Sequence, residues 1–135
     1  MNIFFYGLFM DDAILAQRGI SPRSAETGYV AGFALQIGAR AALVRTEGAR
    51  AYGVMMNIDP SDAAALYSEP SVADYRAEPV IVTTDTGGEV EATCYNLPAP
   101  QVSDANQDYA KSLERVAKRL GFPEPYLEAI RRTYA

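Results

Sequence analysis

The sequence predicts one α+β domain spanning residues 1–135, built on a curved, mainly antiparallel sheet or a small β-barrel with short helices packed around it. The length of 135 residues is that of one domain and suffices to bury a core without disulfides or a structural metal. Strand-like and helix-like segments follow one another without the regular alternation of a doubly wound sheet. We expect about six strands and about four short helices.

The first strand is expected over residues 3–6, Ile-Phe-Phe-Tyr, an apolar run rich in β-forming residues. Gly7 ends this run at a point where backbone freedom is useful. Asp11 or Asp12 then suits the N-cap of a short helix over residues 13–16. We therefore expect a strand that runs through a glycine-containing loop into a helix.

The next part of the chain predicts a hairpin followed by a strand and a helix. Residues 29–44 are strand-like, and a turn is expected at residues 47–49, Glu-Gly-Ala. Residues 50–58 alternate between apolar and other side chains, as in a strand with one buried face. Pro60 suits the first position of a short helix that runs through Tyr67.

Two further strands are expected over residues 75–83 and 89–95. The Asp-Thr-Gly-Gly run at residues 85–88 between them is a strong hairpin signal. Pro79 favours an edge position or a bulge in the first of these strands. Prolines and polar residues then predict a loop over residues 98–105.

The C-terminal part predicts two helices. Apolar residues from Tyr109 to Leu120 fall on one helical face, and Gly121 stands where a C-cap glycine belongs. Pro123 or Pro125 begins a second, shorter helix. Basic residues in this region alternate with glutamates, which is typical of a solvated helix face.

The charge balance argues against nucleic acid and membranes as partners. The net charge is −5 and the sequence pI is near 4.7, whereas attraction to phosphate backbones or anionic lipids needs an excess of Lys and Arg. The chain has no basic leader and no apolar run near the roughly 18 residues of a membrane span. We expect neither interaction.

The absence of histidine excludes Ser-His and Cys-His nucleophilic machinery and histidine-ligated metal sites. Cys94 is the only cysteine, so an internal disulfide and a cysteine-rich zinc site are also excluded. A reducing, cytoplasmic setting fits this composition. Acid–base chemistry must then come from Asp, Glu, Tyr, Lys or the single Cys.

Two local features are candidates for a site. Glu69 directly follows a short apolar helix and precedes a strand, although a solvated loop carboxylate is the simpler interpretation on local grounds. The Tyr6-Gly7 pair at a strand end is commonly core plus turn, but a loop there can also direct N–H groups toward an anion. The residues that follow Gly7, at positions 8–10, are apolar, so a structural or protein-interaction domain is a further interpretation.

The order of these features resembles the gamma-glutamylcyclotransferase-like family. That family has a Tyr-Gly motif after the first strand, a Gly-Val-containing strand in the middle, a glutamate after a short helix, and a Tyr-Arg pair soon after it. A helix, a Gly-Leu-Pro turn and a final helix complete its C-terminal part. The matching segments here are Tyr6-Gly7, Gly53-Val54, Glu69, Tyr75-Arg76, and residues 109–127 with Gly121-Phe122-Pro123 at the turn.

The resemblance implies a curved-sheet or barrel fold and an enzyme of γ-glutamyl and glutathione metabolism that releases 5-oxoproline from a γ-glutamyl amino acid, peptide or amine. It implies Glu69 as the general acid/base, in a partly dry pocket that lifts its pKa toward neutrality. It implies no cofactor and no metal. The substrate-binding residues that it implies are Tyr6, Gly7, Leu8, Phe9, Tyr75 and Tyr95.

Three residues depart from the family pattern. Leu8 and Phe9 replace a Ser-Asn or Thr-Leu pair, and Pro70 replaces the usual glycine after the glutamate. These departures motivate an alternative, a non-catalytic protein that keeps the fold and pocket and binds small molecules. The sequence leaves open the identity of the leaving group and the oligomeric state.

Overall fold

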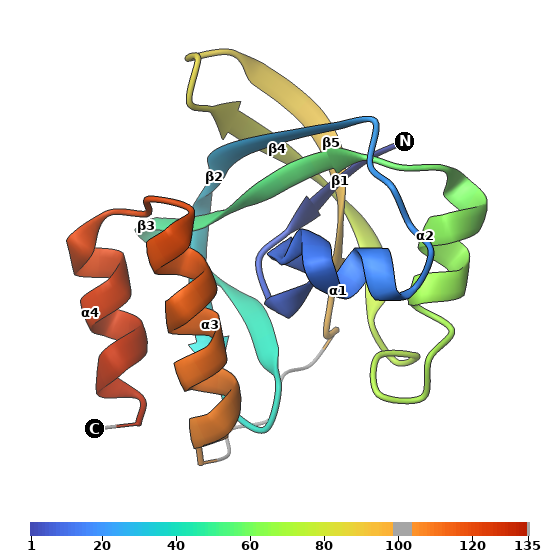
Figure 1. Cartoon of the computed structure of the whole chain (residues 1–135). Coiled ribbons are helices and arrows are strands. Elements are labelled where there is room, and N and C mark those ends of the chain that lie inside the picture. Colours follow the sequence, from blue (N-terminus) through green and yellow to red (C-terminus); the bar gives the residue numbers. More distant parts are fainter. Residues whose placement is uncertain (99–103, 135) are drawn as a thin grey trace.

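The structure, a computed structural model, describes residues 1–98 and 104–134 and is built on a closed five-stranded barrel (Figure 1). The strand order is β1-β3-β2-β4-β5, and the ring closes where β1 runs parallel to β5. Its other strand pairs are antiparallel. The expected α+β fold with a small barrel is thus confirmed. The strands are β1 (Asn2–Phe5), β2 (Ser24–Ile37), β3 (Ala41–Asn57), β4 (Arg76–Thr84) and β5 (Glu89–Asn96).

Short helices surround the barrel. In Figure 1, α3 and α4 lie beside each other on one flank, α1 lies in front of the barrel, and α2 lies on the opposite flank. A single 3₁₀ turn, η1, connects β1 to α1. The helical elements are η1 (Leu8–Met10), α1 (Asp12–Gln17), α2 (Pro60–Leu66), α3 (Gln107–Arg119) and α4 (Glu124–Arg132).

Strand β1 is buried on both faces and serves two hydrophobic cores. Because side chains alternate along a strand, Ile3 and Phe5 face a core that also contains residues of the helices. Phe4 points the other way, into a core made by strand residues and by Tyr6 just beyond β1. Cys94 lies fully buried in this second core, and burial raises the pKa of its thiol to about 12. This thiol is therefore a packing residue.

Several local predictions are confirmed. The Asp11 carboxylate accepts a hydrogen bond from the Ala13 N–H and caps α1. Pro79 pairs with β5, whereas β4 pairs with β2 only at residues 82–84, so Pro79 occupies the expected edge position. Gly121 follows α3 with a φ of 80°, as a C-cap glycine does.

The prediction of a turn at residues 47–49 is wrong. β2 and β3 are joined instead at residues 38–40, and residues 47–49 lie within β3. The glycine signal has a different origin: Gly48 has a φ of 80° and belongs to an irregularity where the pairing register shifts between Ala31 and Phe33 of β2. Residues 41–57 therefore form one long strand, which is why five strands are described where about six were expected.

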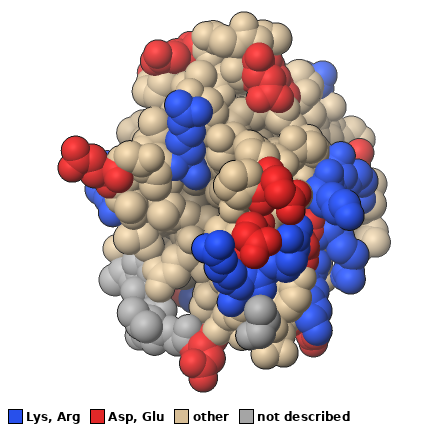
Figure 2. Space-filling view, turned by 90° about the vertical axis from the view of Figure 1, so that its left-hand side faces the viewer, with Lys and Arg blue, Asp and Glu red and all other residues tan. Residues whose placement is uncertain are grey.

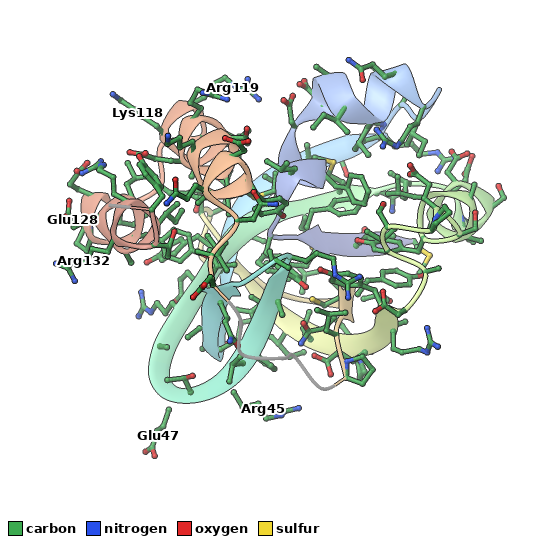
Figure 3. The ribbon with its side chains drawn as sticks, turned by 90° about the horizontal axis from the view of Figure 1, so that it is seen from below. Arg45, Glu47, Lys118, Arg119, Glu128 and Arg132 are labelled. Carbon is green, nitrogen blue, oxygen red and sulfur yellow. The ribbon has the colours of Figure 1, made fainter. Side chains whose placement is uncertain are left out.

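The ribbon formed by β2 and β3 projects beyond the rest of the barrel. Figure 3 shows Arg45 and Glu47 where this ribbon bends, within β3, pointing away from the molecule. The Arg45 guanidinium lies over the Phe33 ring, 4.9 Å from its centre, which is a cation–π contact within the ribbon. The loop expected over residues 98–105 falls largely on residues 99–103, which lie outside the described part of the chain.

Charged side chains of both signs are intermixed on the side of the molecule where α4 lies (Figure 2). Arg131 of α4 donates hydrogen bonds to Glu114 of α3 and to Glu124 and Glu128 of α4. This pairing agrees with the solvated, mixed-charge helix face expected from the sequence. Within residues 1–98 and 104–134, no helix combines the length and apolar character required to cross a membrane.

The contact between β1 and β3 makes a stability prediction. A Cβ on Gly53 would overlap the Phe5 carbonyl oxygen and the Phe4 ring. We expect Gly53→Ala to lower the free energy of unfolding by about 1–3 kcal/mol, because an added methyl in a packed core forces backbone shifts. Urea denaturation measures this change.

Gly88→Ala is the matched control, because its Cβ would meet nothing closer than the Thr84 Oγ1 at 3.7 Å. We expect its free energy of unfolding to stay within about 0.5 kcal/mol of the unmodified protein. Equal destabilisation by the two substitutions would contradict the close approach of β1 and β3.

Candidate functional site

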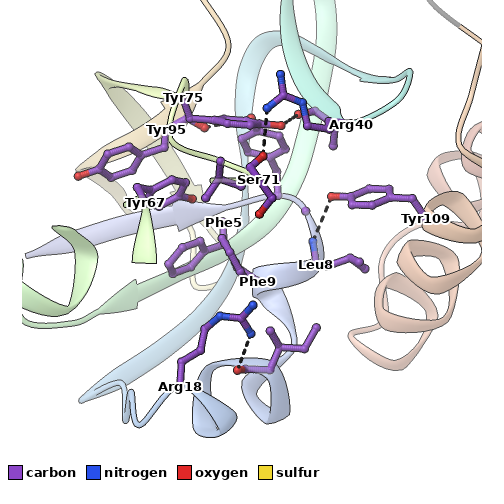
Figure 4. Close-up of a pocket in the computed structure, with 15 residues that line it drawn as sticks. Phe5, Leu8, Phe9, Arg18, Arg40, Tyr67, Ser71, Tyr75, Tyr95 and Tyr109 are labelled. Atoms are coloured by element: carbon purple, nitrogen blue, oxygen red, sulfur yellow. Dashed lines mark hydrogen bonds between the residues drawn. The ribbon is translucent and has the colours of Figure 1, made fainter. Parts of the chain in front are cut away.

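A cavity of about 300 Å³ opens where the end of β1 meets α1, α3 and the segment of residues 67–75 between α2 and β4 (Figure 4). It contains each substrate-binding residue that the family resemblance implied. Glu69 is not among the residues that line it. The lining residues are Phe5, Tyr6, Gly7, Leu8, Phe9, Ile14, Arg18, Arg40, Ala41, Tyr67, Ser71, Val72, Tyr75, Tyr95 and Tyr109.

The loop after β1 presents main-chain groups to this cavity. Leu8–Met10 form a single 3₁₀ turn, in which the Met10 N–H bonds to the Gly7 carbonyl. The Leu8 N–H donates to the Tyr109 hydroxyl at 3.3 Å (Figure 4). Gly7 makes room for that hydroxyl, because a Cβ on residue 7 would lie 2.5 Å from it. A glycine is thus required at residue 7 because the Tyr109 hydroxyl lies where a Cβ would be. Its backbone φ of −109° is one that other residues also adopt.

Tyr109 is a site residue that the sequence did not reveal. It lies on the first turn of α3, and its position there predicted only a place on the apolar face of that helix. Burial raises the pKa of Tyr109 to about 12, so its hydroxyl keeps its proton at neutral pH and can act as a donor as well as an acceptor.

Aromatic rings form one wall of the cavity. Tyr67 stacks on Tyr95 with ring centroids 3.9 Å apart, and it packs edge-on against Phe9 at 5.8 Å. Tyr67 also contacts the Tyr75 ring at 6.3 Å. The sequence assigned Tyr67 to the end of a helix and did not identify it as a lining residue, because nothing local indicates that its ring reaches β5.

Two tyrosine hydroxyls among the lining residues, those of Tyr6 and Tyr75, are bonded to the main chain. Tyr6 donates to the Tyr95 carbonyl at 3.0 Å, and Tyr75 donates to the Ala41 carbonyl. Burial raises the pKa of Tyr6, Tyr67 and Tyr75 above the ordinary tyrosine value. All three stay neutral at pH 7, and the wall carries no negative charge.

Glu69 is held at the edge of the cavity by Arg18. The Arg18 Nε lies 2.8 Å from Glu69 Oε2, and its Nη2 lies 3.0 Å from Oε1, which is the two-pronged geometry of an arginine–carboxylate pair. Both side chains are about one-third exposed, at 35% and 34%. Arg18 itself lines the cavity and lies over the Phe9 ring at 5.5 Å.

The pKa of Glu69 is lowered, chiefly by its hydrogen bonds to Arg18. This direction is opposite to the lift toward neutrality that the family resemblance implied for Glu69 in a partly dry pocket. Two physical differences account for it: the carboxylate is one-third exposed and does not line the cavity, and a guanidinium stabilises its charged form. The sequence offered no signal for Arg18, which is 51 residues away from its partner along the chain.

Arg40 lies on the side of the cavity opposite Arg18 (Figure 4), and it forms a second arginine–carboxylate pair, with Asp74. Arg40 binds the two Asp74 carboxylate oxygens at 2.6 and 2.7 Å and the Ser71 carbonyl at 3.0 Å. Its guanidinium lies 5.4 Å from the centre of the Tyr75 ring. The pair lowers the pKa of Asp74 to about 2. Residues 67–75 are therefore fastened to the barrel at Arg40 and to α1 at Arg18.

Comparison with known proteins gives a family and a fold. The sequence model of the family described as "Gamma-glutamyl cyclotransferase, AIG2-like" matches residues 3–114. A comparison with curated proteins gives no match.

Among solved structures, one described as "Gamma-glutamyl cyclotransferase" is similar with a TM-score of 0.80 at 21% identity, over 97% of this chain and 86% of that one. An uncharacterized protein from Homo sapiens is similar with a TM-score of 0.79 at 21% identity, over 96% and 85%. YkqA from Bacillus subtilis is similar with a TM-score of 0.84 at 22% identity, over 99% of this chain and 54% of that one. At these identities the structural similarities show the fold.

The ion pair at the cavity edge makes a prediction about pH. In Arg18→Met we expect the pKa of Glu69 to rise toward the ordinary value of about 4.3, because the guanidinium that stabilises its charge is gone. NMR titration of the Glu69 side-chain carboxyl carbon measures this pKa. Because the folded-state pKa is the lowered one, the stabilisation by the pair is complete above pH 4.3 or so and is lost as the pH falls through the folded-state pKa.

Arg23→Met is the control, since Arg23 forms an exposed ion pair with Asp59 and does not line the cavity. The pKa of Glu69 should be the same in this variant as in the unmodified protein. An unchanged pKa of Glu69 in Arg18→Met would show that the pair does not form in solution.

Proposed function

The chain belongs to the gamma-glutamyl cyclotransferase, AIG2-like family, and we propose that it is an enzyme that releases 5-oxoproline from a γ-glutamyl amino acid, peptide or amine. The observation that carries this proposal is that Arg18 connects Glu69 to the cavity. Arg18 binds the carboxylate expected from the family motif and lines the same cavity as the Tyr-Gly loop. A small cavity with apolar walls and a few polar groups suits a small molecule.

The proposed reaction is an intramolecular aminolysis. The α-amine nitrogen of the γ-glutamyl group attacks its own γ-carbonyl carbon, and a new C–N bond closes the five-membered ring. The bond from that carbon to the leaving nitrogen then breaks. The attacking ammonium loses two protons as it becomes the lactam N–H. Both are transferred through Glu69 to the leaving nitrogen, one before ring closure and one as the old C–N bond breaks, so that 5-oxoproline and a protonated amine are released.

Little more than correct folding of the substrate is required for this chemistry. Because the nucleophile and the carbonyl belong to one molecule, a well-oriented conformer can reach effective molarities of about 10⁵ M or more. The protein must hold the γ-glutamyl chain in a bent conformation and supply one base. No cofactor is part of the proposal.

The lining residues divide these tasks. We assign the substrate α-carboxylate to the main-chain N–H groups of Gly7, Leu8 and Phe9, with the Tyr109 hydroxyl moving from the Leu8 N–H to the bound anion. Main-chain groups serve this purpose whatever side chain Leu8 carries. Tyr75 and Tyr95 border the reacting part of the substrate.

Tyr6, which also lines the cavity, holds Tyr95 in place, because its hydroxyl donates a hydrogen bond to the Tyr95 carbonyl. The cytoplasmic setting and the absence of nucleic-acid and membrane partners remain predictions of the sequence.

One observation favours the alternative of a binding protein without turnover. Glu69 does not line the cavity, and Arg18 occupies both of its carboxylate oxygens. A carboxylate held in this way is a weak base, since its pKa is lowered. If Glu69 stayed on Arg18 when the cavity was filled, the protein would bind γ-glutamyl compounds and leave them intact.

Release of 5-oxoproline distinguishes the two functions. We expect the purified protein to release 5-oxoproline from at least one γ-glutamyl amino acid, peptide or amine, measured by chromatography. Glu69→Gln should lower this rate by about 10²-fold or more, because general acid–base catalysis contributes about 10²–10⁴-fold. Circular dichroism should show that the variant keeps its fold.

The matched control is Glu47→Gln, which removes an exposed carboxylate from the bend of the β2–β3 ribbon, outside the cavity. It should retain the full rate. Undiminished activity in Glu69→Gln would overturn the assignment of Glu69, whereas binding of γ-glutamyl compounds without release of 5-oxoproline would favour the alternative.

A further inference from the structure

Arg18 presents a charge to the cavity that the proposed reaction does not yet use. Of the described residues that line the cavity, Arg18 and Arg40 carry a formal charge at neutral pH. They approach it from opposite sides (Figure 4). Each is paired with a carboxylate, but the two partners differ, because Asp74 has no part in the proposed chemistry and Glu69 is its base.

Arg40 attaches the segment of residues 67–75 to the barrel. Its Nη1 and Nη2 contact both Asp74 oxygens, and Nη1 also contacts the Ser71 carbonyl. Its pairing holds residues 67–75 on the barrel whether or not the cavity is occupied. A ligand that took Arg40 would have to replace both of these partners.

Arg18 is bound differently. Among the described residues, its guanidinium makes one hydrogen bond besides those to Glu69, from Nη1 to the Ile14 carbonyl at 3.3 Å, and it lies over the Phe9 ring at 5.5 Å. The Nε and Nη2 edge that holds Glu69 fits any carboxylate equally well, because the spacing of the two donors matches the two oxygens. Arg18 is one-third exposed and lines the cavity, so a carboxylate inside the cavity can compete for that edge.

Glu69 must separate from Arg18 before its carboxylate can act as a base of ordinary strength. If no other group binds Arg18, this separation breaks two charge-assisted hydrogen bonds. If another carboxylate takes the place of Glu69, Arg18 forms both hydrogen bonds again. A γ-glutamyl amino acid brings two carboxylates, one on its glutamyl part and one on its leaving group. A γ-glutamyl amine brings only the first, which the proposed function assigns to the Gly7 to Phe9 loop.

We propose that Arg18 is the specificity-determining residue that selects leaving groups bearing a carboxylate: this carboxylate replaces Glu69 on the guanidinium and frees Glu69 to act on the reacting amine. The substrate class is then γ-glutamyl amino acids, and peptides with a carboxylate at the same position, in preference to γ-glutamyl amines. The catalytic part of this inference, the release of Glu69, rests on the proposed function. The binding part, a preference for ligands with a second carboxylate, rests on the Arg18 contacts alone.

The test compares γ-glutamyl-alanine with γ-glutamyl-ethylamide, whose leaving groups differ by one carboxylate. We expect the unmodified protein to favour γ-glutamyl-alanine by about tenfold in kcat/KM, the lower end for hydrogen bonds to charged groups because Arg18 is partly exposed. In Arg18→Met this ratio should fall to near one, because Glu69 is then unpaired for both compounds and the carboxylate of γ-glutamyl-alanine has no guanidinium to bind. Arg23→Met, which removes an exposed arginine outside the cavity, should keep the original ratio.

A purely structural role for Arg18 would lower kcat/KM for both compounds by the same factor and keep their ratio. That result, or a lack of preference in the unmodified protein, would overturn the inference. Thermal unfolding of each variant shows whether the fold is retained.

If neither compound yields 5-oxoproline, the proposed function fails for these substrates and the inference is tested by binding. Calorimetric titration should then show tighter binding of γ-glutamyl-alanine than of γ-glutamyl-ethylamide, with the difference lost in Arg18→Met. Equal affinities in the unmodified protein would overturn it.

Discussion

Closure of the barrel by β1 is the constraint on which the rest of the structure depends. This strand of four residues joins β3 on one side to β5 on the other, and its side chains enter both hydrophobic cores. Gly53 allows the close approach to β3. The same strand ends in the Gly7 loop, so the packing that closes the barrel also fixes the main-chain groups at the cavity.

The segment of residues 67–75 completes the cavity, and two arginine–carboxylate pairs attach it from opposite sides. Arg40 holds Asp74 and Arg18 holds Glu69, and each pair lowers the pKa of its carboxyl group. Both carboxylates are therefore charged at neutral pH, and both pairs are lost only as the pH falls through the lowered pKa values. The cavity edge is held by charge, while the stacked tyrosines hold its wall by apolar contact.

The sequence predicted what local patterns determine. The strand expected from the apolar run at residues 3–6, the Asp11 cap and the glycine after α3 are read from neighbouring residues, and each is present in the structure, the strand as β1 at Asn2–Phe5. Gly48 shows the limit of such patterns. Its backbone conformation is the one that glycine favours, but whether the chain turns there or continues as a strand depends on the pairing with β2.

The site was predicted in the same uneven way. The residues around Gly7 and Tyr75 were predicted because they belong to the family motifs, and they line the cavity. Arg18, Tyr67 and Tyr109 were missed, since their roles depend on contacts between segments far apart along the chain.

The most direct test of the central claim is a crystal structure of the Glu69→Gln variant with γ-glutamyl-alanine bound. The account predicts the glutamyl α-carboxylate against the Gly7 to Phe9 main chain and the γ-carbonyl beside residue 69; a ligand bound outside this cavity, or with that carboxylate away from the loop, would contradict it.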